Sequence, residues 1–87
     1  NTLVNVSQNY PNPTNGMTSV DVSITKPTTL SIEVVNMMGQ VVYTENKGKV
    51  SEGKYRFNFD ASKFNSGIYF YTVKANDNAH TSKMMVQ

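Results

Sequence analysis

Apolar and polar residues alternate strictly over residues 19–25, so that Val20, Val22 and Ile24 share one side of the chain. A period of two is typical of a β-strand with one buried and one solvent-exposed face. Residues 30–34 and 55–59 repeat the pattern, whereas residues 68–73 are almost entirely apolar or aromatic, which suits a central strand. No window has a sustained 3.6-residue period. The chain is therefore expected to fold as strands.

The composition favours the same conclusion. The 87 residues include 11 Val, 9 Thr and 3 Ile, but only 3 Ala and 2 Leu. β-Branched residues pack well on a pleated surface and lose rotamer freedom on a helix. Further short strands are expected at residues 3–6, 41–44 and 81–86. A chain of this length forms one domain, and we predict an all-β, immunoglobulin-like antiparallel β-sandwich of about seven strands.

Turn residues separate these segments. Residues 11–16 contain two prolines and Gly16, which permits positive φ, so they cannot continue a strand. Residues 36–39, Asn-Met-Met-Gly, have the pattern of a type I turn that closes a hairpin. Residues 46–48 and 51–53 are expected to flank a short connection, and residues 76–78 to form the last hairpin turn.

The longest connection is predicted over residues 60–67. Asp60 can cap the amides of the following turn, and Phe64 can fill the end of the core. Gly67 allows a sharp return into the next strand, where we expect Gly67→Val to destabilise the fold. Tyr69 then occupies the place of a corner tyrosine in this class of sandwich.

Catalytic chemistry has little support. The chain has no cysteine, its six carboxylates are scattered, and His80 is the only histidine, in a predicted exposed turn. No nucleophile elbow, phosphate-binding loop or calcium-binding loop occurs. We therefore expect no enzyme activity, no catalytic residues, no metal site and no cofactor.

Basic residues are also too few for nucleic-acid binding. The net charge is only +2, and Lys47, Lys49, Lys54 and Arg56 are expected to bracket one hairpin with glutamates among them. Lysines that protect a sheet edge explain this set better than a nucleic-acid site.

Tyr69 and Tyr71 share one face of their strand. If that face were open, it would offer a platform for sugar rings. We favour the alternative that both side chains pack inside the sandwich.

Five motifs occur in order along the chain, and together they resemble a known family. They are residues 9–16 (NYPNPTNG), residues 34–42 (VVNMMGQVV), Gly53, residues 60–71 (DASKFNSGIYFY) and residues 83–86 (KMMV). This series is similar to the type A C-terminal sorting domain of the type IX secretion system, the Por secretion system sorting domain family. Phe64 stands where that family more often has Leu, and Gln87 ends a chain that in the family often ends in a basic residue.

The resemblance implies a secretion signal at the end of a cargo protein of a Bacteroidetes bacterium. Such cargo reaches the periplasm through its own N-terminal signal and is then recognised by an outer-membrane translocon and a shuttle protein. A sortase-like cysteine protease generally removes the domain, and the cargo is secreted or held at the cell surface. No nucleic acid takes part.

The resemblance also assigns roles to residues. Recognition is expected at the end of the chain, in Lys83, Met84, Met85 and Val86, which would present a free sheet edge. The other matching residues are mainly structural: Pro11, Asn12, Pro13, Gly16, Gly39, Gln40, Asp60, Gly67 and Tyr69.

The expected domain organisation follows from the extent of the motifs. Residues 9–87 form the sorting domain, and residues 1–8 are the end of a linker or a short first strand. The chain opens without a signal peptide, so an N-terminal cargo domain is expected upstream. A fibronectin-type or carbohydrate-binding adhesion module and a structural spacer remain the alternatives, since they share this architecture.

Overall fold

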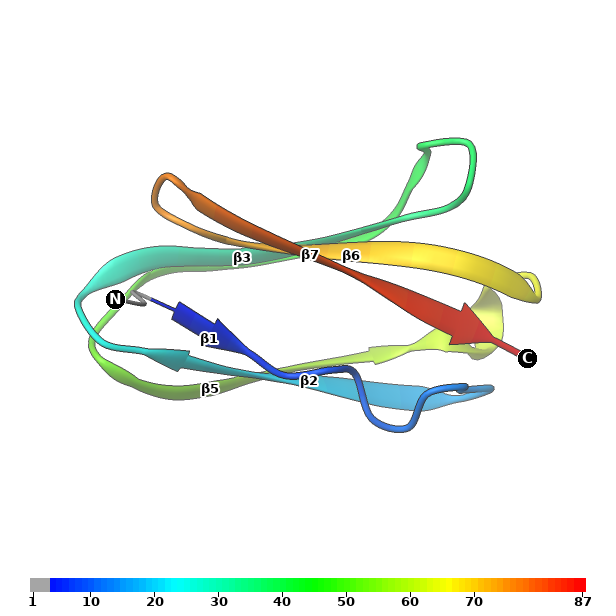
Figure 1. The fold of residues 1–87 in the computed structure, drawn as a ribbon, viewed down its shortest axis with the longest axis horizontal. Helices are drawn as coiled ribbons and strands as arrows, with labels where there is room; N and C mark the ends of the chain where they lie inside the picture. The colour runs from blue at the N-terminus through cyan, green and yellow to red at the C-terminus, as the bar shows by residue number, and fades with distance from the viewer. Residues whose placement is uncertain (1–3) are drawn as a thin grey trace.

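Residues 4–87 are described by a computed structural model, and they form seven strands and one short 3₁₀ helix (Figure 1). The elements are β1 (Val4–Val6), β2 (Met17–Ile24), β3 (Thr28–Val35), β4 (Val41–Val50), β5 (Gly53–Asp60), η1 (Ala61–Lys63), β6 (Gly67–Ala75) and β7 (Asn78–Val86). Every strand expected from the sequence is present, although Leu3 of the first one lies outside the described residues.

The strands form two antiparallel sheets that stack as layers. The smaller sheet has the order β1-β2-β5, and the larger has the order β4-β3-β6-β7. Figure 1 shows the two layers face to face, with the β3–β4 hairpin projecting beyond the larger sheet. The predicted immunoglobulin-like antiparallel β-sandwich is confirmed, and β6 is a central strand as its apolar sequence indicates.

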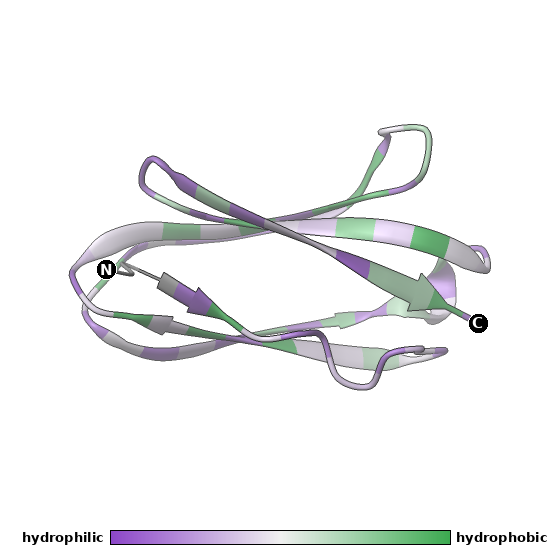
Figure 2. Cartoon of the chain, viewed as in Figure 1, coloured by the Kyte–Doolittle hydropathy of each residue, from purple (hydrophilic) through white to green (hydrophobic). Residues whose placement is uncertain are grey.

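The core lies between the layers and follows the alternation in the sequence. In β2, Val20, Val22 and Ile24 are buried, whereas the residues between them reach solvent. β3 and β6 alternate in the same way, as the banding along the strands in Figure 2 reflects. The remaining buried apolar residues are Leu30, Ile32, Val34, Phe57, Phe59, Ala61, Tyr69, Tyr71, Val73, Ala75, Met84 and Val86.

A short connection joins β4 to β5 at residues 51–52, but the expectation that residues 46–48 flank it is wrong. Residues 46–48 lie inside β4, where Leu30 pairs with Gly48 but Ser31 pairs with Asn46, so Lys47 is the extra residue of a β-bulge. Gly48 has a φ of +71°, and its N–H donates to the side chain of Asn46 at 2.7 Å. The sequence has turn residues here because a bulge in a strand needs similar backbone freedom.

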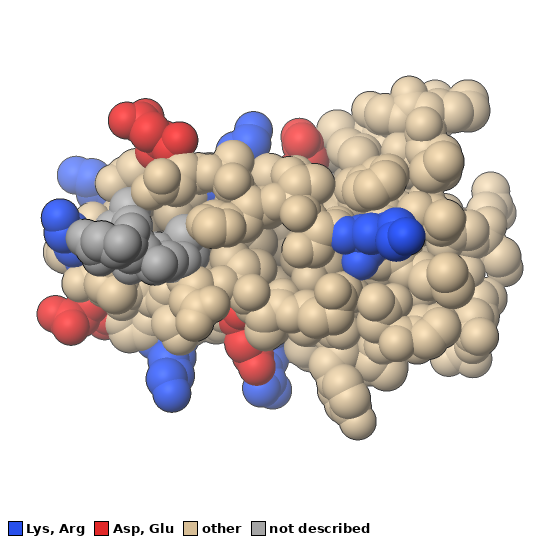
Figure 3. Space-filling view, in the orientation of Figure 1, with Lys and Arg blue, Asp and Glu red and all other residues tan. Residues whose placement is uncertain are grey.

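The basic residues do not bracket a single hairpin, because β4 and β5 belong to different sheets. Each is the edge strand of its sheet, which agrees with lysines that protect edges. Lys47 pairs with Glu45 at 3.2 Å and lies 5.0 Å above the ring of Phe57. On the face shown in Figure 3, basic and acidic side chains are interspersed, without a continuous basic surface.

Candidate recognition surface

The end of β7 divides the four predicted recognition residues into two pairs. Met84 and Val86 are 0% and 3% exposed and belong to the core, because alternate residues of a strand face opposite sides. Lys83 and Met85 face solvent. Only Lys83 and Met85 can therefore offer their side chains to a partner while the domain is folded.

We expected from the sequence that the outer edge of this strand end is free. In the structure this edge is covered. Residues 8–14, which we call the strap, lie along it. The Thr14 N–H donates to the carbonyl of Met85 at 3.0 Å, and the Gln87 N–H donates to the carbonyl of Thr14 at 2.8 Å. The free-edge expectation is wrong here because a segment more than 70 residues away in sequence fills the position of a neighbouring strand.

Two side chains of the strap complete the contact. The Met85 N–H donates to Oδ1 of Asn12 at 3.0 Å, and Nε2 of Gln8 donates to the carbonyl of Lys83 at 3.0 Å. Pro11 and Pro13, each after a cis peptide bond, have no N–H of their own to donate. The Pro-Asn-Pro motif thus reaches the final strand through the side chain of its asparagine.

The strap is anchored to both sheets by buried polar groups. The Asn9 N–H donates to Oη of Tyr71 in β6 at 3.0 Å, and Nδ2 of Asn9 donates to Oγ1 of Thr18 in β2 at 3.1 Å. Asn9 and Thr14 are each 2% exposed. Sequence reasoning missed Asn9 and Thr14 as structural residues, because the groups they bind lie far along the chain and no local pattern predicts them.

The first hairpin turn, which begins at Asn36, positions the motif residues Gly39 and Gln40. Gly39 has a φ of +82°, and its N–H donates to the carbonyl of Asn36 at 3.0 Å, as the predicted turn requires. Nδ2 of Asn36 donates to Oε1 of Gln40 at 2.9 Å.

Gly16 does not have a positive φ; instead its carbonyl accepts from the Ala61 N–H at 2.9 Å. The positive φ that this residue type permits is therefore not used at Gly16, although residues 11–16 do interrupt the strands as expected.

The connection over residues 60–67 matches its predicted local structure. Oδ1 of Asp60 accepts from the Ser62 N–H at 2.9 Å and caps η1, and this hydrogen bond lowers the pKa of the carboxyl group. Gly67 has a φ of +149°. The Tyr69 hydroxyl donates to the carbonyl of Asn65 at 2.6 Å, which is the geometry of a tyrosine corner.

Phe64 fills the end of the core between two other rings. Its centroid is 6.4 Å from that of Phe59 and 5.2 Å from that of Tyr69. Both tyrosines of β6 face inward, and Tyr71 is 0% exposed. The packing that the sequence analysis favoured is confirmed, so an open sugar platform on this face is excluded.

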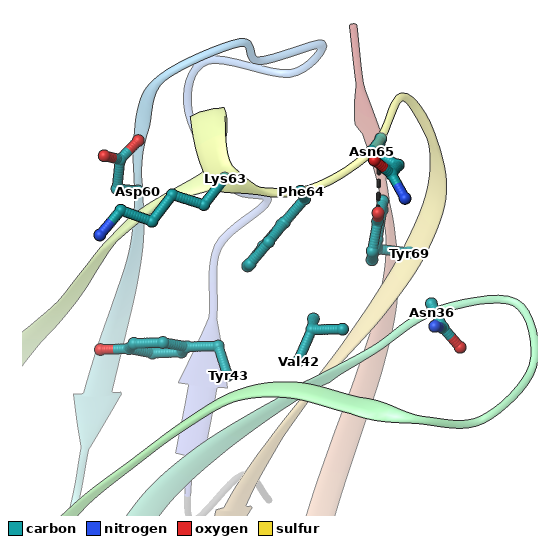
Figure 4. Close-up of a pocket in the computed structure, with 8 residues that line it drawn as sticks. All are labelled: Asn36, Val42, Tyr43, Asp60, Lys63, Phe64, Asn65 and Tyr69. Carbon is teal, nitrogen blue, oxygen red and sulfur yellow. Dashed lines mark hydrogen bonds between the residues drawn. The ribbon is translucent and has the colours of Figure 1, made fainter.

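A groove of 470 Å³ opens beside these rings, between the start of β4 and the residue 60–67 connection. Figure 4 shows Tyr43, Phe64 and Tyr69 along it, with Asp60 and Lys63 on one side. The chemistry of this lining is mainly aromatic and amide, without a pair of carboxylates or a histidine. The neighbouring hairpin leaves large apolar side chains exposed, namely Met37, Met38, Val41 and Val42.

Other kinds of site find little support in the described chain. Residues 4–87 contain no group of three His, Cys, Asp or Glu side chains that could hold a metal ion. His80 is exposed on β7. No helix within these residues is long and apolar enough to cross a membrane.

The stacked sheets and the strap over the last strand define a small all-β sandwich module. Residues 8–87 match the family model described as the secretion system C-terminal sorting domain, so the chain belongs to that family. Among solved structures, the sulfur carrier protein SoxY from Chlorobium limicola f thiosulfatophilum is 14% identical, with a TM-score of 0.47 over 100% of this chain and 76% of that chain. The comparison with curated proteins gave no match.

Family membership assigns the general function. The chain is a C-terminal sorting signal of the type IX secretion system, and such signals are generally non-catalytic. It acts through the type IX secretion machinery on a cargo protein that is secreted or displayed at the cell surface.

Proposed function

We propose that the exposed side chains at the end of β7, Lys83 and Met85, are the contact by which the secretion machinery reads this signal. The supporting observation is their exposure on the same strand whose other residues, Met84 and Val86, are anchored in the core. A strand held from inside presents its outer side chains in one fixed arrangement, which lowers the entropic cost of binding.

The finer steps of the pathway are proposed from the family resemblance. An outer-membrane translocon and a shuttle protein receive the domain from the periplasm, and the cargo upstream of residue 1 crosses with it. A sortase-like cysteine protease then removes the domain. The cargo ends outside the cell or at its surface, in a bacterium of the Bacteroidetes type.

We also propose residues 9–87 as the sorting domain and residues 1–8 as the end of a linker or a short first strand, within which β1 spans Val4–Val6. β1 supports this assignment because three of its residues pair with β2. The Ser7 N–H extends the ladder by donating to the carbonyl of Asp21 at 2.9 Å.

The test is a cargo fusion expressed in a bacterium with a type IX system. Deletion of residues 83–87 should leave the cargo in the periplasm, but this deletion also removes two core residues and so does not separate recognition from folding. The sharper variant is the double substitution Lys83→Ala with Met85→Ser, which leaves the core intact.

The matched control makes the same substitutions at exposed positions away from β7, in Lys26→Ala with Met38→Ser. We expect the β7 double variant to keep the melting temperature of the wild type and to retain cargo in the periplasm, while the control is secreted. Normal secretion of a folded Lys83→Ala, Met85→Ser fusion would overturn the proposal.

A further inference from the structure

Among residues 4–87, partners for the outer edge of β7 are found only at residues 83–87, which leaves the first half of this edge open to them. β7 is the last strand of its sheet, so one row of its backbone groups points away from β6. Met85 belongs to this row, because its N–H and carbonyl both bind the strap. Backbone direction alternates along a strand, so Thr81 and Ala79 point the same way. Toward the start of β7, Lys83 is the last residue that a hydrogen bond from the strap reaches.

The covered half is held by few contacts. Four hydrogen bonds join the strap to residues 83–87, and only two of them are between backbone groups. The prolines prevent the strap from forming a regular ladder, since they lack N–H groups. Tyr10 is 80% exposed, and residues 11–13 are also exposed. Segments with few buried apolar contacts open at a low free-energy cost, so residues 11–14 can open while Asn9 and Tyr10 stay bound to Tyr71 and Ser19.

We infer that the β7 edge is a docking edge for an extended β-strand of the secretion machinery, and that the strap gates it. The incoming strand pairs first with the open half, over residues 78–82. It then displaces the strap from residues 83–87. This inference rests on the proposed role of the end of β7 in recognition.

The hydrogen-bonding capacity of the edge supports an extended strand as the occupant. A strand that runs along all of β7 reaches the outward groups of Ala79, Thr81, Lys83 and Met85 in one ladder, whereas the strap reaches only the last two. The side chains of residues 78–81 are exposed and none of them is large and apolar. Such a surface suits main-chain pairing better than an apolar pocket interaction.

Amide hydrogen exchange, measured by NMR on the intact chain, tests whether the strap opens by itself. The amides of Thr14 and Gln87 report on its two backbone bonds, and the Phe57 amide reports on the core. We expect Thr14 and Gln87 to exchange through a local opening that costs less free energy than the opening of Phe57. Equal opening free energies for all three amides would overturn the gate.

Asn12 provides the variant for this experiment. Asn12→Ala removes the acceptor for Met85 and should speed exchange at Thr14 and Gln87 by roughly fivefold to tenfold, the effect of one lost hydrogen bond. Asn12→Asp keeps an oxygen acceptor and is the matched control. Unchanged exchange at Thr14 and Gln87 in Asn12→Ala would contradict the strap's dependence on this contact.

A covalent lock tests whether opening is needed for secretion. The chain has no cysteine, so Thr14→Cys with Val86→Cys, at positions paired between the strap and β7, can form only one intramolecular disulfide, and the bacterial periplasm favours it. These positions leave Lys83 and Met85 unchanged, and mass spectrometry verifies the bond. We expect the locked fusion to stay in the periplasm, while each single-cysteine variant is secreted.

The outcomes separate the two proposals. If the locked fusion is secreted as well as its single-cysteine controls, while Lys83→Ala with Met85→Ser is retained, the gate is wrong and the recognition role stands. If the Lys83 and Met85 variant is secreted normally, the recognition role is wrong and the gate falls with it.

Discussion

The hydroxyl of Tyr71 in β6 donates a hydrogen bond of 3.0 Å to the backbone carbonyl of Ser7, 64 residues earlier in the chain. The same oxygen accepts from the Asn9 N–H at 3.0 Å. A side chain from the centre of the larger sheet therefore holds the segment between β1 and β2 of the smaller one. This link closes the side of the sandwich on which the strap meets β7.

Tyr71→Phe should lower the free energy of unfolding by about 1–3 kcal/mol, because it removes the partner of the buried Asn9 N–H and of the partly buried Ser7 carbonyl. Each kcal/mol corresponds to about 4–8 °C in Tm for a domain of this size. Thermal unfolding followed by circular dichroism measures the change. Tyr55→Phe, which loses an exposed bond to Ser51, is the control and should change Tm less.

Tyr71 should also make the domain sensitive to alkali. Burial raises the pKa of its hydroxyl above the ordinary value. Its stabilising contribution is fully present below the unfolded pKa of about 10 and is lost as the pH rises through the higher folded pKa. Unfolding in urea between pH 8 and pH 11 should therefore show a steeper loss of stability in the wild type than in Tyr71→Phe. Parallel curves would contradict this role.

Gly67→Val should destabilise the domain by more than about 1 kcal/mol, because its φ of +149° is unfavourable for any residue with a Cβ. The cost is one of backbone conformation, since an added Cβ meets no atom within 4 Å. Gly16→Ala is the matched control: its site is equally open, but its φ is not positive. Equal Tm values for both variants would rule out this explanation.

Neighbouring methionines near the end of β7 should respond differently to the same change. Met84→Ala should cost about 2–5 kcal/mol, because it opens a cavity in the core. Met85→Ala, with a side chain exposed to solvent, should change stability by less than about 0.5 kcal/mol. Chemical denaturation of the two variants measures both values, and a similar cost for both would contradict the observed orientation of the strand.

Asp60 should contribute to stability only above acidic pH. The hydrogen bond from Ser62 lowers the folded pKa of its carboxyl group, so its contribution is present above the unfolded value of about 4. It is lost as the pH falls through the lower folded pKa. Asp60→Ala should lower Tm at pH 7, and the difference from wild type should shrink below about pH 3. Asp60→Asn, which keeps an acceptor, should be affected less at pH 7.

Local chemistry was enough to predict much of the site. The asparagine turn that ends at Gly39, the cap at Asp60 and the corner at Tyr69 each depend on residues within four positions of one another. Interactions of such short range can be read from residue types and spacing. The bulge at Gly48 could not, because it depends on how β3 and β4 pair, and an Asn-Lys-Gly sequence is equally suitable for a turn.

The sequence alone determined the strands, the buried faces of β2, β3 and β5, and the order of motifs that places the chain in its family. These depend on the period of the side chains and on local backbone preferences. Only the tertiary structure decided that Met84 and Val86 face the core and that residues 8–14 cover the last strand. The contact between Asn12 and Met85 spans 73 residues of sequence, and such a contact depends on how the two sheets stack.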